Sequence, residues 1–127
     1  MMDCYFGSYN LPGQNELDKS AVVTFHIPDV GIRFKAPFSA VNNHHGDLAA
    51  LLALLEFIDS NQKYFSKHTY QIYGTNRHVI DGVNRRDRMD AMFADLLTKA
   101  QQYRQKYQFS LKWVSADENQ AYDPLSD

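Results

Sequence analysis

The sequence predicts an α/β domain built on a mixed five-stranded sheet with helices on its faces. Three β-rich segments follow one another with short turn segments between them, which is typical of an antiparallel meander. The pattern then alternates between helix and strand, and a meander followed by such alternation implies a mixed sheet. With 127 residues and 44% hydrophobic composition, the chain can form a substantial core. We therefore expect a single domain over residues 1–127.

The strand predictions rest on runs of aromatic and β-branched residues. The run "AVVTFHI" ends at the turn segment "PDVG", and apolar residues then alternate with the residues of a polar face from Ile32 to Phe38. The predicted strands cover residues 3–9, 21–27, 32–38, 69–73 and 108–115.

Two segments show helical periodicity. Residues 47–59 are apolar around most of the helix circumference, which predicts burial on more than one face. Residues 89–103 carry apolar side chains along one stripe, which predicts a long surface helix. After residue 115 the chain has room for about one helical turn before Pro124, which cannot continue a helix.

Charge and composition exclude several classes of protein. The formal charge of -2 argues against a strongly basic nucleic-acid module, although it leaves room for a local basic patch. The single cysteine, Cys4, excludes an internal disulfide, and we expect it to be a small buried residue. The N-terminus lacks a signal-peptide pattern, and the longest apolar run, residues 48–55, is too short to span a bilayer. We therefore expect a cytoplasmic protein with no membrane partner.

Four short segments, taken in this order, resemble the ribonuclease H-like superfamily, and type 1 ribonuclease H in particular. "CYFGSYN" resembles a first strand with an aspartate followed by Gly-Ser, and "VNNHHGDLAALLALLEFI" resembles an Asn-Asn segment before a helix that opens with a glutamate. "IYGTNRHVIDGV" resembles a fourth strand ending in Asp-Ser, with a short helix after it. "LKWVSADENQAYDPLS" resembles a last strand with Trp-Val followed by an Asn-x-x-x-Asp-x-Leu segment. The resemblance covers nearly the whole chain.

The resemblance implies cleavage of the RNA strand of an RNA–DNA hybrid by two magnesium ions, held by one carboxylate from each segment. Such an ion pair needs several carboxylates because magnesium prefers oxygen ligands and carries a high charge. Position by position, this chain keeps two of those four acids, Asp47 and Asp123, whereas the other two positions hold Phe6 and Thr75. A histidine loop of the family is shortened here to "SADE". We therefore expect a catalytically inactive domain with no cofactor, and Mg²⁺ or Mn²⁺ only if it is active.

The same segments supply the candidate binding residues. The resemblance assigns nucleic-acid contacts to the polar residues Ser8, Asn42, Asn43, Asn76 and Arg77. The expected partner is an RNA–DNA hybrid or another nucleic acid, with a protein partner or a second copy of the chain as alternatives.

A group of arginines follows Asn76 and has two interpretations. It is either a phosphate-contacting patch beside the site or a solvated loop and helix start, and alternation with acids favours the second interpretation. The arginines are Arg77, Arg85, Arg86 and Arg88.

Other residues near the predicted site also have two interpretations. We interpret His44 and His45 as a solvent-exposed pair before the helix, because zinc needs three or four ligands. Asp47 is interpreted first as a helix cap, with a remnant metal ligand as the alternative. Phe6 is expected to pack in the core in place of an emptied metal site, whereas Tyr9 and Tyr122 are expected beside that site.

Three functions remain open at this stage. The first is an inactive ribonuclease H-like domain that acts by binding nucleic acid or a protein. The second is a metal-dependent nuclease with a rebuilt site, for which Asp47 and Asp123 are candidate ligands together with Asp117 or Glu118. The third is a protein-interaction or self-assembling module, suggested by the modest charge and the many aromatic residues.

Overall fold

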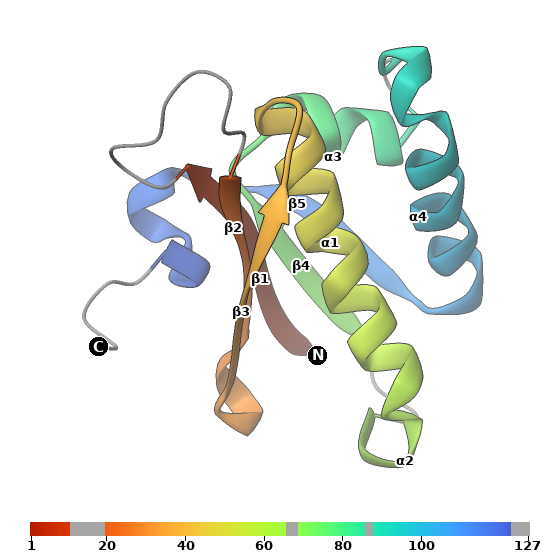
Figure 1. Cartoon of the computed structure of the whole chain (residues 1–127). Helices are drawn as coiled ribbons and strands as arrows, with labels where there is room; N and C mark the ends of the chain where they lie inside the picture. The colour runs from red at the N-terminus through yellow and green to blue at the C-terminus, as the bar shows by residue number, and fades with distance from the viewer. Residues whose placement is uncertain (11–19, 66–68, 86–87, 123–127) are drawn as a thin grey trace.

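The computed structural model of the chain contains one sheet, with α-helices gathered on one of its faces (Figure 1). The structure describes residues 1–10, 20–65, 69–85 and 88–122. The strands are β1 (Met2–Asn10), β2 (Ser20–Ile27), β3 (Ile32–Ser39), β4 (Tyr70–Gly74) and β5 (Phe109–Trp113). The helices are α1 (Asn43–Ser60), α2 (Gln62–Phe65), α3 (Arg77–Val83) and α4 (Ala94–Lys106). Short 3-10 turns are η1 (Pro28–Val30), η2 (Ala91–Phe93), η3 (Ala116–Glu118) and η4 (Gln120–Tyr122).

The sheet is mixed, as the sequence predicts. Its strand order is β3-β2-β1-β4-β5. β1 pairs antiparallel with β2, and β2 pairs antiparallel with β3, which completes the predicted meander. On its other side β1 pairs in parallel with β4, and β4 pairs in parallel with β5. β1 is therefore the central strand, and the direction of pairing changes across it.

Helix α1 is the centre of the core, as its sequence pattern predicts. It packs against β1 and β2 on one side and against α4 on another, so apolar residues are buried on more than one face. Leu48, Leu51 and Leu55 are among its fully buried residues. The helix begins at Asn43 rather than at the predicted residue 47, because the side chain of Asn42 accepts the backbone N–H of His45 and caps the helix there.

The surface helix also differs from its prediction at one end. The expected helix over residues 89–103 is preceded by the 3-10 turn η2, and α4 begins at Ala94. The carboxylate of Asp90 accepts the N–H of Met92 and so starts the 3-10 turn. Among the described residues, no helix is long and apolar enough to cross a membrane.

The face of the sheet opposite α1 carries short C-terminal turns. Figure 1 shows the segment with η3 and η4 on the side of the sheet away from the long helices. The hydroxyl of Thr24 on β2 donates to the carbonyl of Ala121, 3.3 Å away, and so attaches η4 to the sheet. The predicted helical turn before Pro124 is therefore present, as 3-10 structure.

Candidate functional site

A cleft of about 500 Å³ opens at the carboxyl ends of the parallel strands β1 and β4, beside the first turn of α1. β2, which follows β1 in the chain, lies beside β1 on one side of the pair, and β5, which follows β4, lies beside β4 on the other side. Ligands of open α/β sheets bind at such switch points in strand order. The cleft is lined by Ser8, Asn43, His44, Asp47, Thr75, Asn76, Arg77, Trp113 and Tyr122.

Asp47 is a buried acid at the base of this cleft, with 7% of its surface exposed. One carboxylate oxygen accepts the hydroxyl of Ser8 at 2.7 Å, and the other accepts the side-chain amide of Asn76 at 3.0 Å. Burial raises the pKa of Asp47 above its ordinary value, while the two hydrogen bonds oppose that shift. The interpretation of Asp47 as the helix cap was wrong, because Asn42 is the cap and Asp47 lies one turn further along α1.

Asn76 joins three elements around the cleft. Its side-chain nitrogen lies 2.9 Å from Nδ1 of His44 and also donates to Asp47. Its side-chain oxygen accepts the N–H of Val79 and caps α3. The amide is therefore held between the end of β4, the start of α3 and the first turn of α1.

The adjacent histidines are not a solvent-exposed pair before the helix, as the sequence suggested, but are half-buried in the first turn of α1. His44 faces Asn76, and its ring lies 4.5 Å from the ring of His78. His45 turns the other way: its Nδ1 accepts the N–H of Val41, and its ring packs against Phe38. Among the described residues, no group of three or more His, Cys, Asp or Glu side chains could hold a metal ion.

Phe6 is fully buried, so the structure agrees with its expected role in the core. A Cβ atom placed on Gly74 of the neighbouring strand would lie 2.4 Å from Cζ of the Phe6 ring. The ring therefore fills the space between β1 and β4 beneath the cleft. An apolar side chain thus stands where the resemblance assigns the first acid.

Thr75 follows β4 and takes part in polar contacts with the C-terminal segment. Its hydroxyl accepts the side-chain amide of Asn119 at 3.1 Å, and the same amide donates to the carbonyl of Phe6 at 3.0 Å. The carbonyl of Thr75 accepts the indole N–H of Trp113 at 2.8 Å. Asn119 is buried, and sequence reasoning did not assign it a role, although it is the asparagine of the Asn-x-x-x-Asp-x-Leu segment.

Tyr122 closes the cleft on the side of β1. Its hydroxyl accepts the N–H of Ser8 at 3.3 Å and donates to the carbonyl of Ser8 at 3.2 Å. The ring crosses the strand at Gly7, where a Cβ atom would lie 2.4 Å from it. Burial and the neighbouring charge of Asp47 raise the pKa of Tyr122 to about 12. Tyr122 therefore lies at the site as predicted, whereas Tyr9 is exposed and is not among the residues lining the cleft.

The opposite wall of the cleft is a cation–π pair. The guanidinium carbon of Arg77 lies 4.0 Å from the centre of the Trp113 ring, and 39% of Trp113 is exposed. Arg85 and Arg88 are exposed and are not among the lining residues, and Arg86 lies outside the described residues. Among the described arginines, Arg77 is thus the one that lines the cleft.

The predicted site residues fall into two groups. Ser8, Asn43, Asn76 and Arg77 line the cleft together with Asp47. Asn42 is exposed, and its side-chain oxygen is used by the helix cap. Asp123, the other retained acid, lies outside the described residues.

The donor groups of the described lining residues do not fit a pair of magnesium ions. Asp47 is the one carboxylate among the described lining residues, and each of its oxygens already accepts a hydrogen bond. Phe6 offers no ligand, and the hydroxyl of Thr75 is engaged by Asn119. Two divalent ions need several carboxylates to offset their charge.

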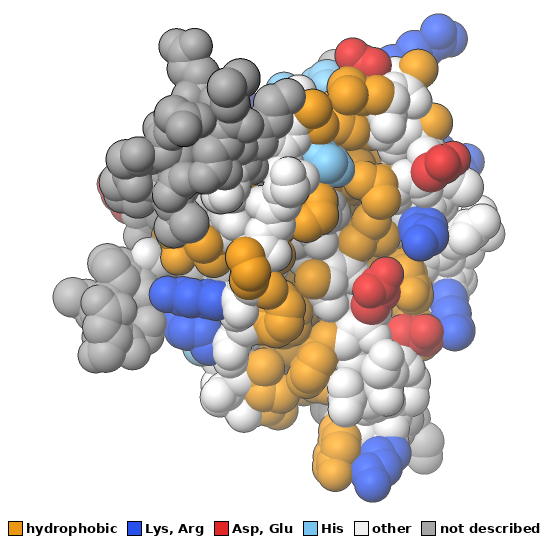
Figure 2. Space-filling model, viewed as in Figure 1, with side chains coloured by type: hydrophobic (Ala, Val, Ile, Leu, Met, Phe, Trp, Pro, Cys, Tyr) orange, Lys and Arg blue, Asp and Glu red, His pale blue; other side chains and the backbone are white. Residues whose placement is uncertain are grey.

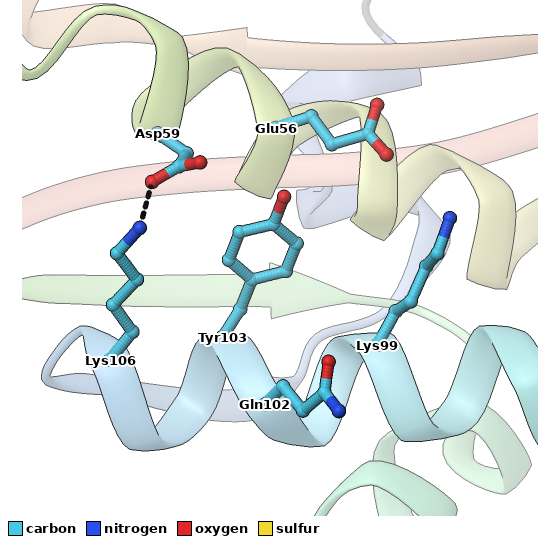
Figure 3. Close-up of a pocket in the computed structure, with 6 residues that line it drawn as sticks. All are labelled: Glu56, Asp59, Lys99, Gln102, Tyr103 and Lys106. Atoms are coloured by element: carbon cyan, nitrogen blue, oxygen red, sulfur yellow. Dashed lines mark hydrogen bonds and ion pairs between the residues drawn. The ribbon is translucent and has the colours of Figure 1, made fainter.

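A second cavity, of about 320 Å³, lies between α1 and α4 (Figure 3). Lys106 on α4 contacts Asp59 on α1 at 2.8 Å, and the hydroxyl of Tyr107 also bonds to Asp59. The hydrogen bond between Lys106 and Asp59 is the largest cause of both pKa shifts in this pair. It lowers the pKa of Asp59 and raises the pKa of Lys106. These exposed contacts hold two helices together, and such pairs contribute little stability.

Comparisons with known proteins identify the fold. No family model and no curated protein sequence matches the chain. Among solved structures, the chain is similar to LC11-RNase H1 in complex with an RNA/DNA hybrid, with a TM-score of 0.78 and 9% identity over 94% of this chain and 89% of that one. It is also similar to RNase H1 from the halophilic archaeon Halobacterium salinarum NRC-1, with a TM-score of 0.73 and 14% identity over 96% and 91% of the two chains.

A third similar structure is the N-terminal RNase H domain of a Mycobacterium tuberculosis protein, fused to maltose binding protein. Its TM-score is 0.70, with 11% identity over 93% of this chain and 84% of that one. The chain therefore has the ribonuclease H-like fold, as the resemblance implies. At such low identities the likeness shows the fold and leaves the activity to the residues of the site.

Proposed function

We propose that this chain is a ribonuclease H-like domain that binds nucleic acid in the Asp47 cleft without cleaving it. The observation that carries the proposal is the position of Phe6. Its buried ring stands where the resemblance assigns the first acid, and it fills the space beside Gly74. A phenyl ring cannot ligate a metal ion, so the two-metal reaction loses a required ligand.

The remaining polar groups of the cleft suit recognition. Asn43 presents an amide, and the Thr75 hydroxyl, which accepts from Asn119, still has its own O–H to donate. Such groups contact sugars, phosphates and base edges in nucleic-acid complexes. Arg77 adds a guanidinium next to the exposed ring of Trp113, a combination that contacts phosphates and stacks on bases. One similar structure holds an RNA/DNA hybrid, and we therefore propose a hybrid as the ligand.

The rebuilt metal site is the competing enzyme hypothesis. It requires Asp123 beside Asp47, with Asp117 or Glu118 as a further ligand. Glu118 accepts the hydroxyl of Ser115 at 3.0 Å, and Asp117 is exposed on η3. The same experiment separates the two hypotheses, because it measures binding and cleavage of one substrate.

The experiment uses a fluorescently labelled RNA–DNA hybrid, with anisotropy for binding and a denaturing gel for cleavage in Mg²⁺ and then in Mn²⁺. We expect binding without cleavage, and we expect Arg77→Glu to weaken binding about tenfold, a typical effect of losing a cation that contacts a phosphate or base. Arg85→Glu is the matched control, since it makes the same charge change on an exposed residue outside the cleft.

Two results would overturn the proposal. The first is metal-dependent cleavage that disappears in Asp47→Asn and Asp123→Asn, which would establish the rebuilt nuclease. The second is hybrid binding that is lost equally in Arg77→Glu and Arg85→Glu, which would show that the cleft does not provide the contact.

A specific surface feature favours a second function, protein interaction. Figure 2 shows an apolar strip where β3 lies beside α1. The strip consists of half-buried side chains, which are Ile32, Phe34, Ala36 and Phe38 on β3 and Ala49, Ala53 and Phe57 on α1. Lys35 and Pro37 on the same edge strand discourage direct strand pairing. Light scattering over a range of concentrations tests this function, and a dimer that Phe34→Lys dissociates would support it.

A further inference from the structure

A row of side chains, one from each strand, crosses the sheet on the face opposite α1. Tyr5 on β1 pairs in register with His26 on one side and with Tyr73 on the other. His26 pairs with Arg33 on the edge strand β3, and Tyr73 pairs with Lys112 on the edge strand β5. These five side chains form what we call the tyrosine row.

Strand alternation places the row on the face away from α1. Successive side chains of a strand point to opposite faces, and the neighbours of Tyr5 are the buried core residues Cys4 and Phe6. His26 likewise lies between buried residues of β2, and Tyr73 between buried residues of β4. The α-helices that the structure describes lie on the other face (Figure 1). The described part of the C-terminal segment contacts this face further along the strands, at Thr24 and Gly7.

We propose that the tyrosine row is a second binding site, which takes single-stranded nucleic acid. This second site is separate from the Asp47 cleft, because it lies on another face of the molecule and uses different residues. Four steps between adjacent strands, at about 4.8 Å each, give the row a length of roughly 19 Å. A few nucleotides span that length.

The centre of the row offers aromatic surface. The rings of Tyr5 and Tyr73 lie 5.0 Å apart at an interplanar angle of 22°, and both side chains are half-buried. Bases stack on aromatic side chains with little regard to sequence, and sheet surfaces are established platforms for such stacking. Burial and the nearby charge of Asp3 raise the pKa of both tyrosines. Their hydroxyls are protonated donors at neutral pH, as those of an ordinary tyrosine are.

The ends of the row offer positive charge. Arg33 and Lys112 stand at the two edges of the sheet, and Lys35 follows Arg33 on the same face of β3. Nη1 of Arg33 is buried and has no hydrogen-bond partner among the described residues. Among the described acids, Asp3 lies on this face two residues before Tyr5, and Asp29 lies in η1 toward the same end of the strands. Asp117 and Glu118 are exposed on η3, on the same side of the sheet but after the carboxyl end of β5. A chain whose net charge is -2 thus gathers cations along a line of aromatic rings, which complements a single strand of nucleic acid.

The test measures the anisotropy of a labelled single-stranded DNA dodecamer with the full chain. We expect Tyr5→Leu and Tyr73→Leu each to weaken binding about tenfold, the usual effect of removing one stacking partner. Lys112→Glu should weaken binding and lower the slope of log affinity against log salt by about 1. Circular dichroism checks that each variant is folded.

The matched control replaces a tyrosine and lysine pair elsewhere. Lys63 lies 5.2 Å from the ring centre of Tyr64 on α2, and 67% of Tyr64 is exposed. The variant Tyr64→Leu with Lys63→Glu makes the same chemical changes, and we expect it to bind the dodecamer as the unmodified chain does.

Three results would overturn the inference. The first is unchanged affinity in a folded Tyr5→Leu, Tyr73→Leu double variant. The second is equal competition by polyglutamate of the same charge, which would make the row a general anion or acidic-protein surface. The third is loss of dodecamer binding in Arg77→Glu, which would place the single strand in the cleft.

Discussion

The ring of Phe6 occupies the space beside Gly74, where a Cβ atom would lie 2.4 Å from the ring. Both residues are buried on adjacent parallel strands, so neither can move away without disturbing the sheet. We expect Gly74→Ala to lower the free energy of unfolding by about 1–3 kcal/mol, the usual cost of overpacking a core. Urea unfolding followed by circular dichroism measures this change.

A double-mutant cycle separates the contact with Phe6 from the general cost of changing a glycine. Phe6→Leu narrows the side chain at that position, so we expect Gly74→Ala to cost less when it is combined with Phe6→Leu. An identical cost in both backgrounds would mean that the ring does not limit the space at Gly74.

The buried carboxylate of Asp47 predicts a pH-dependent stability. Burial raises the pKa of Asp47 in the folded state. Ionisation of this acid is therefore easier in the unfolded chain and lowers the stability of the folded protein. The penalty is present at neutral pH and disappears as pH falls below the ordinary value near 4. In Asp47→Asn the amide oxygen can accept from Asn76 while the amide nitrogen donates to the hydroxyl of Ser8. We therefore expect this variant to raise the melting temperature at pH 7 and to lose this advantage in acid.

Thermal melts between pH 3 and pH 7 measure this effect. Asp117→Asn is the control, since it removes an exposed carboxylate. If Asp47→Asn is instead less stable at pH 7, the hydrogen bonds to the charged acid outweigh its burial. A stabilising Asp47→Asn would mean that the chain keeps this acid at a cost, as functional sites often do.

Tyr122 holds the C-terminal segment on β1 through both backbone groups of Ser8. We expect Tyr122→Phe to lower the free energy of unfolding by about 1 kcal/mol, because the part-buried N–H and carbonyl of Ser8 lose their partner. The raised pKa of about 12 adds a second effect: stability falls as pH rises from the ordinary value near 10 through 12. Tyr122→Phe should therefore flatten the loss of stability in alkali, whereas the exposed control Tyr64→Phe should leave it unchanged.

Cys4 is predicted to be unreactive in the folded protein. It is fully buried, and burial raises the pKa of its thiol from 9.0 to about 12. The thiolate fraction at pH 8 is then about a thousandfold lower than that of an ordinary cysteine. We expect a disulfide reagent to modify Cys4 only in guanidinium chloride, as followed by absorbance, and rapid modification of the native protein would contradict its burial.

Much of the fold could be predicted from local pattern. Apolar and polar residues alternate along β3 because one face of the strand packs on the core. The surface of α1 is apolar almost all round because the helix is buried on more than one face. The burial of Phe6 could also be predicted, because burying an apolar ring is favourable and no metal ion has to be reached from this position. The predicted start of α1 at residue 47 was wrong. Asn42 and Asp47 are both residue types that cap helices, and it is Asn42 that caps α1, through the N–H of His45.

The contacts of the site could not be predicted in the same way. Asp47 meets Ser8 and Asn76, which are 39 and 29 residues away in the chain. Such contacts depend on the parallel pairing of β1 with β4, and no local pattern specifies that register. The tyrosine row depends on four strand pairings at once, so it becomes visible only in three dimensions.

The anchoring of β1 by the C-terminal turns has a consequence for synthesis on the ribosome. The backbone groups of Ser8 bond to Tyr122, 114 residues later, and the carbonyl of Phe6 bonds to Asn119. In a nascent chain these backbone groups of β1 therefore lack their partners until residues 119–122 have been synthesised. Contacts of such long sequence separation form late and slowly. During that interval the emerging strand is open to chaperones and to mispairing, and a stalled product ending before residue 119 would lack the bonds from Asn119 and Tyr122 to β1.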